Sequence, residues 1–182
     1  MVIKYIILTI LLLLFSFYVF RVIVRKDYLK NFKLSPISYV LEFIVFASHA
    51  NFMYLFLPVK WPNMPHLPES LFILSISGII VIVGLLILII AWFGLGTSRS
   101  FGQDKNKLKT VGIYKYSRNP QLVGYGLVVL SFTIMYLSWF SIGWFILYLI
   151  ISYFMILSEE EFLKKKYRNE YLGYCKSVSR IF

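Results

Sequence analysis

The chain has 182 residues, of which 59% are hydrophobic and only 15% are charged, and its mean hydropathy is +0.76. Apolar runs of this length exclude an ordinary soluble domain and predict an all-α, multi-pass integral membrane protein. The net charge of +11 is typical of membrane proteins with basic connections, so we predict no nucleic-acid partner, and the single cysteine and two histidines predict no metal site.

Five apolar segments follow one another along the chain, each close to the ~20 residues that a helix needs to cross the hydrocarbon core. They cover residues 2–24, 36–57, 70–95, 121–137 and 139–157. Arg21, Arg25 and Lys26 at the end of the first segment predict a retained helix rather than a cleaved signal peptide. Little more than Ser138 separates the last two segments, which predicts a tight helical hairpin; four spans with one re-entrant hairpin is the alternative.

The basic residues predict which way these segments cross the membrane. Of the 19 Lys and Arg residues, 17 lie at the end of the first segment, in the first and third connections or in the C-terminal tail, and only Lys4 and Lys60 fall on the opposite side. Because basic residues concentrate on the cytoplasmic side, we expect the N-terminus outside and these connections in the cytoplasm. We divide the chain into a three-helix membrane region, residues 1–95, and a C-terminal region, residues 96–182.

A few polar residues and glycines interrupt the apolar segments. Glu42 and His49 are seven residues apart and share one face of the second segment. We expect Glu42 to pair with Arg21 of the first helix, and His49 to form an interhelical hydrogen bond. In the third segment, Gly78 and Gly84 predict close packing against another helix.

The C-terminal tail alternates aromatic and basic residues at helical spacing. Leu163, Tyr167, Tyr171 and Tyr174 recur at intervals of four, four and three, with lysines between them. This pattern predicts an amphipathic helix that lies on the inner membrane surface.

Two polar cassettes flank the predicted hairpin. Residues 112–120, GIYKYSRNP, precede the fourth segment, and residues 159–161, three consecutive glutamates, follow the fifth. Both are expected on the cytoplasmic side, where the helix start after Pro120 attracts an anionic group and Glu159 and Glu160 accept hydrogen bonds or face a cation. The two cassettes together predict a site for a zwitterionic small molecule beside an apolar cavity.

These cassettes resemble those of a known enzyme group. Gly112, Tyr114, Arg118, Asn119, Pro120 and Gly124 follow a Gly-x-Tyr…Arg-His-Pro-x-Tyr-x-Gly motif, and Glu159, Glu160, Leu163, Tyr171, Tyr174, Val178 and Arg180 follow a Glu-Glu-x-x-Leu…Tyr-x-x-Tyr…Val-x-Arg ending. Both are similar to motifs of the isoprenylcysteine carboxyl methyltransferase and phospholipid methyltransferase group. The resemblance runs from about residue 99 to the C-terminus, which is the catalytic region in that group.

The resemblance implies S-adenosylmethionine in a cytoplasmic pocket and a lipophilic acceptor that enters from the bilayer. The cofactor-binding residues that it implies are Asn106, Lys107, Leu108, Lys109, Tyr114, Asn119, Pro120, Gln121, Leu122 and Glu159. Arg118, Asn119 and Glu159 are the implied catalytic residues. A carboxylate suits the sulfonium cation of the methyl donor, and the helix start suits its carboxylate.

The chain also departs from the pattern of that group. Asn119 and Asn106 stand where histidines are common, and Leu122 stands where a tyrosine is common. Met155 occupies the position of an arginine that holds the substrate carboxylate in isoprenylcysteine enzymes, so an uncharged or amine-bearing lipid is the better-fitting acceptor. An NADPH-dependent sterol-type membrane reductase, whose C-terminal pattern is similar, and a non-enzymatic membrane protein are the alternatives.

Overall fold

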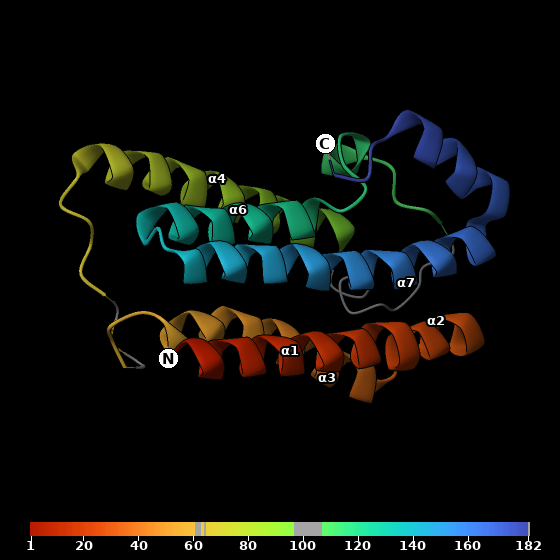
Figure 1. Cartoon of the computed structure of the whole chain (residues 1–182). Helices are drawn as coiled ribbons and strands as arrows, with labels where there is room; N and C mark the ends of the chain where they lie inside the picture. Colours follow the sequence, from red (N-terminus) through yellow and green to blue (C-terminus); the bar gives the residue numbers. More distant parts are fainter. Residues whose placement is uncertain (61–62, 64, 97–106, 182) are drawn as a thin grey trace.

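The computed structural model describes residues 1–60, 63, 65–96 and 107–181, and every regular element in this part is helical. Figure 1 shows α4, α6 and α7 side by side in one layer, with the N-terminal helices along the other side of α7. The helices are α1 Val2–Tyr18, α2 Arg25–Asn31, α3 Pro36–Asn51, α4 Leu71–Leu95, α6 Pro120–Met135 and α7 Trp139–Ser177. Short turns of other helix types cover Val19–Val24, Phe52–Leu55 and Gly112–Lys115.

Three helices are long and apolar enough to cross a bilayer. They are the continuous helix Val2–Asn31, α4 and α7, and α6 is a shorter apolar helix. The first helix extends seven residues past its predicted apolar segment, because a π-helical turn at Val19–Val24 carries the chain directly into α2. The second predicted span is shortened instead: α3 ends at Asn51 and a 3-10 turn, Phe52–Leu55, follows.

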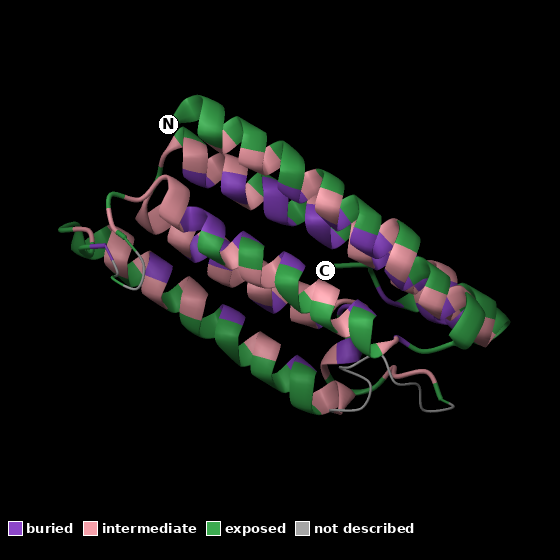
Figure 2. Ribbon diagram, turned by 90° about the horizontal axis from the view of Figure 1, so that it is seen from below, coloured by how far each residue is buried: buried purple, intermediate pink, exposed green. Residues whose placement is uncertain are grey.

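Figure 2 shows that exposed residues cover the outward faces of the helices, while buried residues lie along the faces turned towards neighbouring helices. Many of the exposed residues are large and apolar: Phe43, Phe72 and Phe93 are each more than 70% exposed. A soluble protein does not tolerate so extended an apolar surface, whereas a bilayer covers it. The chain is therefore an integral membrane protein with several apolar helices.

The predicted hairpin is present between α6 and α7. Residues 136–138 connect the two helices, and Ser138 caps α7 through a reciprocal capping box with Ser141. The Ser141 amide donates to Ser138 Oγ at 3.1 Å, and the Ser138 amide donates to Ser141 Oγ at 2.9 Å. This box fixes the point at which the chain reverses direction.

A seam of small residues holds α6 against α4. A Cβ atom placed on Gly84 would lie 2.8 Å from the Gly124 carbonyl oxygen, and one placed on Gly124 would lie 2.7 Å from that of Gly84. Further along, the Ser131 hydroxyl donates to the Ser77 carbonyl at 2.7 Å. The expected close packing at Gly84 is thus confirmed, whereas Gly78 has no such neighbour and its expected role is wrong.

His49 joins α3 to both helices of the hairpin. Its Nε2 donates to the Trp144 carbonyl at 3.1 Å, which leaves Nδ1 to accept from the Tyr125 hydroxyl at 3.0 Å. The Trp144 indole in turn donates to the His49 carbonyl at 2.7 Å, and the two rings are stacked. The prediction of an interhelical hydrogen bond at His49 is confirmed.

The predicted pair between Arg21 and Glu42 is wrong. Arg21 donates instead to Glu161 at 2.6 Å and to Ser158 at 3.1 Å, both on α7. The π-helical turn contains Arg21 and changes the rotation of the residues around it, which sequence spacing does not reveal.

The tail after Glu161 is helical, as the sequence predicts. Its first part continues α7, and a second helical segment follows a break at Arg168, where φ is 44° and ψ is −117°. Beyond the bend the chain folds back towards the start of α6 (Figure 1). Tyr171 and Tyr174 are buried there with Val178 and do not face outward, because they pack on Leu108 of the preceding loop. We call residues 169–181 the C-terminal strap.

Candidate functional site

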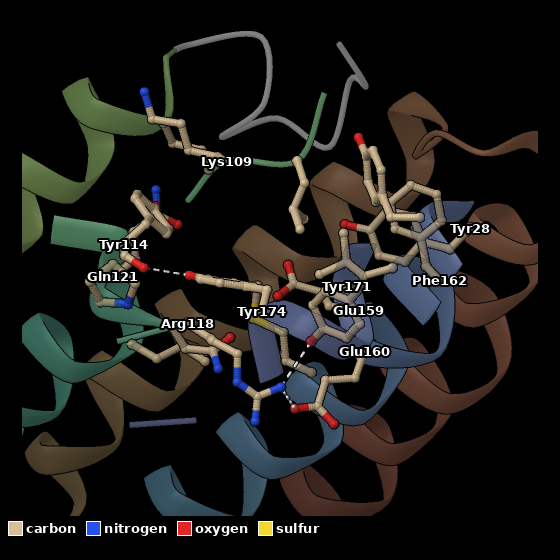
Figure 3. A pocket seen from close by; sticks show the side chains of 18 of the residues that line it. Tyr28, Lys109, Tyr114, Arg118, Gln121, Glu159, Glu160, Phe162, Tyr171 and Tyr174 are labelled. Carbon is tan, nitrogen blue, oxygen red and sulfur yellow. Dashed lines mark hydrogen bonds and ion pairs between the residues drawn. The ribbon is translucent and has the colours of Figure 1, made fainter. Parts of the chain in front are cut away.

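The start of α6, the second half of α7, the C-terminal strap and α2 together enclose a cavity of about 150 Å³ (Figure 3). Its wall combines charged side chains with many aromatic rings. The lining residues are Tyr28, Leu95, Lys107, Leu108, Lys109, Tyr114, Arg118, Asn119, Pro120, Gln121, Leu122, Met155, Glu159, Glu160, Phe162, Leu163, Tyr167, Tyr171 and Tyr174.

The structure brings the sequence-predicted site residues together around this cavity. Nine of the ten expected cofactor-binding residues line it, although the first and last of the nine, Lys107 and Glu159, are 52 positions apart in the chain. Arg118 also lines it. The tenth, Asn106, lies outside the described residues.

The loop before α6 is held by Tyr114. Gly112 has a φ of 67°, a conformation that favours glycine, and opens the short 3-10 turn that contains Tyr114. The buried Tyr114 hydroxyl donates to the Ala91 carbonyl of α4 at 3.3 Å, and burial raises the pKa of Tyr114, so this phenol stays neutral. Its carbonyl accepts from the Tyr174 hydroxyl at 2.6 Å, which attaches the strap to the loop.

The N-terminus of α6 opens on the cavity without a side-chain cap. Asn119 occupies the capping position and Pro120 the first turn, but the Asn119 amide group donates to the Arg180 carbonyl at 2.9 Å. Asn119 therefore makes no side-chain cap hydrogen bond to the first turn of α6, whose leading backbone N–H groups lie outside the helical hydrogen-bond pattern. Such a helix start favours an anionic group.

The three consecutive glutamates of α7 have three different environments. Glu161 pairs with Arg21 and Arg25 and ties α7 to the first helix. Glu160, only 6% exposed, accepts from Arg118 at 3.0 Å and from Arg180 at 2.9 Å. Glu159 lines the cavity, and among the described residues no hydrogen bond or ion pair neutralises its carboxylate. The structure thus separates Glu159 from Glu160, which the sequence had grouped as two ligand contacts.

The guanidinium of Arg118 contacts other side chains of the protein. One guanidinium nitrogen lies 3.0 Å from Glu160, donates to the Tyr171 hydroxyl at 3.1 Å and reaches Cys175 Sγ at 2.7 Å. The hydrogen bonds from Arg118 to Tyr171 and from Tyr174 to Tyr114 are drawn in Figure 3. Arg118 therefore fastens the strap beside the cavity. Its catalytic role stays a prediction.

Tyr28 and Phe162 line the cavity but were not among the residues that the sequence analysis assigned to the site. Tyr28 of α2 stacks on Phe162 of α7, with ring centroids 4.6 Å apart and planes inclined by 11°. Tyr28 lies in the basic first connection, more than 130 residues from Phe162, and no sequence pattern joins the two. Only tertiary packing of α2 on α7 brings them to one wall.

Residues 71–170, more than half of the chain, match the sequence profile of the phospholipid methyltransferase family. The chain belongs to this family. Phospholipid methyltransferases are membrane enzymes that use S-adenosylmethionine, and their name denotes a lipid-type methyl acceptor. No curated protein and no solved structure matches the chain significantly.

The cavity of this member of the phospholipid methyltransferase family offers groups that suit S-adenosylmethionine. Glu159 provides a carboxylate for positive charge, and the start of α6 together with Lys107 and Lys109 suits the carboxylate of the methionine part. Aromatic faces such as that of Tyr114 suit an adenine ring or a sulfonium. The residues present therefore fit the methyl donor in chemical type.

Proposed function

We propose that this phospholipid methyltransferase methylates an amine on the head group of a membrane lipid, in the cavity at the cytoplasmic end of its bundle. The observation that carries the proposal is the Glu159 carboxylate, which lines the cavity without a cationic partner among the described residues. A half-buried carboxylate left in this state favours a ligand that brings positive charge. Both a sulfonium donor and an amine acceptor do so.

Different residues around the cavity would bind different parts of the methyl donor. S-adenosylmethionine, when bound, supplies a methyl group on a positively charged sulfur. The start of α6 and Lys109 hold the anionic end of the donor, and Glu159 holds the cationic part. The Tyr171 and Tyr174 rings of the strap exclude water, which methyl transfer between oriented groups requires.

The charges of the cavity wall favour an amine over a carboxylate as the methyl acceptor. Met155, at the position of an arginine in the similar isoprenylcysteine enzymes, lines the cavity and brings no charge. Arg118, another cation of the cavity wall, is paired with Glu160. Glu159 can instead accept the proton that an ammonium group must lose before its nitrogen becomes nucleophilic.

We further propose that the chain crosses the membrane five times with this cavity in the cytoplasm. The 16 residues of α6 extend ~24 Å, so a modest local thinning of the bilayer accommodates it. α3 with the turn that follows it, residues 36–55, is of similar size. Basic residues of α2, of the loop before α6 and of the strap gather at the end of the bundle that holds the cavity, as the positive-inside rule requires of a cytoplasmic side.

Membranes containing the full chain, incubated with S-adenosylmethionine labelled at the methyl group, test the acceptor. We expect label in the lipid extract, in amine-bearing phospholipids, and its loss by at least 100-fold in Glu159→Gln. Label in protein only, or in neutral lipids only, would overturn the amine proposal. Calorimetry with S-adenosylhomocysteine on the purified protein tests the donor site separately, and no binding would overturn the assignment of the cavity.

A further inference from the structure

The guanidinium of Arg118 has one nitrogen in use and one edge free. Its Nη1 makes the contacts with Glu160, Tyr171 and Cys175. Its Nε is buried without a hydrogen-bond partner, and its Nη2, which is accessible, has no partner among the described residues either. Figure 3 shows the same asymmetry, because the dashed lines from Arg118 leave a single nitrogen. Nε and Nη2 together form an edge that binds a carboxylate or a phosphate at two points.

Positive charge exceeds negative charge around Glu160. Its carboxylate lies 3.0 Å from Arg118, 2.9 Å from Arg180 and 3.7 Å from Lys164. None of these three cations pairs with another carboxylate in the described part of the chain. Arg180 binds Glu160 through its own Nε and Nη2, which is the edge that Arg118 leaves free. One negative charge thus faces three positive charges, and the cluster attracts a further anion.

The cluster lies where the cavity meets the surface of the protein. Arg118 lines the cavity and its side chain is only 11% exposed, whereas Lys164 and Arg180 are about half-exposed. Glu159, which is proposed to face the amine, is the neighbour of Glu160 in α7. A ligand with a positive and a negative group on a short linker can therefore place one against Glu159 and the other against the free edge of Arg118.

We propose that Arg118 binds the phosphodiester of the acceptor lipid through Nε and Nη2 while the amine of the same head group lies at Glu159. This inference rests on the proposed function, because it concerns the same acceptor. The phosphodiester accepts two charge-assisted hydrogen bonds, and the excess positive charge around Glu160 balances its charge. Arg118 is thus a substrate-binding residue that selects an amine lipid by its phosphate and orients the nitrogen towards the methyl donor.

The carboxylate of the methyl donor is the competing occupant of this edge, but the cavity offers it other groups. Lys109 lines the cavity and has no partner among the described residues, and the start of α6 opens on the same space. These groups are enough for one carboxylate. The edge of Arg118 is therefore left for a second anion, and the two occupants differ in what they predict for donor binding.

The experiment compares two acceptors that differ by one negative charge. One is a short-chain diacylglycerol aminoethyl phosphodiester, and the other is its methyl phosphotriester, which keeps the amine but has a neutral phosphate. Rates of methyl transfer from labelled S-adenosylmethionine, with the full chain in detergent micelles, give KM and kcat for each acceptor. In wild type we expect the KM of the triester to exceed that of the diester by at least ~5-fold. A smaller difference would overturn the proposal.

Arg118→Lys keeps the positive charge beside Glu160 but removes the free edge. We expect the KM of the diester to rise at least ~5-fold while that of the triester stays within ~2-fold, so the preference for the diester is lost. The matched control Arg25→Lys changes an arginine that pairs with Glu161 outside the cavity, and both of its KM values should equal those of wild type. Equal rises in both KM values of Arg118→Lys would overturn the proposal.

A partial loss of folded protein does not disturb this comparison, because it lowers kcat without changing KM. If Arg118→Lys does not accumulate, the wild-type difference between the two acceptors decides alone. Calorimetry with S-adenosylhomocysteine identifies the competing occupant. We expect the Kd of Arg118→Lys to stay within ~3-fold of wild type. A rise of ~10-fold or more, with the KM preference unchanged, assigns the edge to the donor carboxylate and overturns the proposal.

The outcomes also separate this inference from the proposed function. A wild type that methylates neither amine lipid overturns the proposed function. Methylation of both lipids with equal KM values leaves the proposed function standing and overturns the role of Arg118 alone.

Discussion

Arg180 and Glu160, twenty residues apart, form a two-point ion pair in which Nε and Nη2 of the arginine each lie 2.9 Å from a carboxylate oxygen. These hydrogen bonds raise the pKa of Arg180, so its charge is never lost under ordinary conditions. The pair attaches the end of the strap to α7 beside the cavity. Since the strap contributes Tyr171 and Tyr174 to the cavity wall, its attachment should govern ligand retention.

Breaking this pair should loosen the strap. We expect Arg180→Ala to weaken S-adenosylhomocysteine binding about 5-fold, ~1 kcal/mol, since the arginine is 42% exposed and its charge is partly screened. The loss should appear as faster dissociation, measured by stopped-flow displacement. Lys176→Ala is the matched control, because this exposed residue of the same strap forms no ion pair among the described residues. Equal dissociation rates in the two variants would contradict the prediction.

The seam between α4 and α6 should tolerate no added methyl group. In Gly124→Ala the new Cβ would lie 2.7 Å from two backbone atoms of α4, which cannot rotate away. We expect ~1–3 kcal/mol of destabilisation and a lower melting temperature in detergent, followed by tryptophan fluorescence. Gly78→Ala, where nothing lies within 4 Å, should melt at or above the wild-type temperature because alanine favours the helix. A Gly124→Ala variant as stable as Gly78→Ala would show that the helices are further apart.

His49 should be needed for stability rather than for chemistry. His49→Ala removes the hydrogen bonds to the Tyr125 hydroxyl and to the Trp144 carbonyl inside the bundle. We expect ~2–4 kcal/mol of destabilisation from the lost ring and its hydrogen bonds, with the S-adenosylhomocysteine Kd of the folded fraction unchanged within 2-fold. The control Asn51→Ala removes only an exposed bond within α3 and should be neutral. A large change in Kd with an unchanged melting temperature would refute the structural role.

Composition and local spacing predict the helices of this chain better than they predict the contacts between them. The apolar segments and the hairpin at Ser138 follow from hydropathy and capping, which are local properties. The partner of Arg21 depends on a π-helical turn, and the burial of Tyr171 depends on the bend at Arg168. Neither the turn nor the bend has a local sequence signal, so both predictions failed for the same reason.

In the candidate site, too, some residues are predictable from local sequence and others only from tertiary contacts. Its residues from Lys107 to Leu122, with Glu159, were collected from a resemblance between motifs, and the fold places the described ones around one cavity. Tyr28 belongs to α2, which carries no such motif. Its place in the cavity wall exists only because α2 packs against α7. Sequence reasoning without tertiary contacts had no means of finding it.

The choice of acceptor should depend on Met155, which lies one helical turn before Glu159. In Met155→Arg the new guanidinium lies four residues before Glu159, within reach of a helical ion pair, and would neutralise the carboxylate proposed to receive the amine. We expect transfer of labelled methyl groups to amine lipids to fall at least 10-fold, while the S-adenosylhomocysteine Kd changes less than 3-fold. Met155→Leu, which keeps the apolar wall, should retain more than half of the activity. Because the added cation also gives a carboxylate a partner, Met155→Arg should label a prenylated cysteine above the wild-type background. Unchanged labelling of amine lipids in Met155→Arg would mean that the acceptor nitrogen does not approach Glu159.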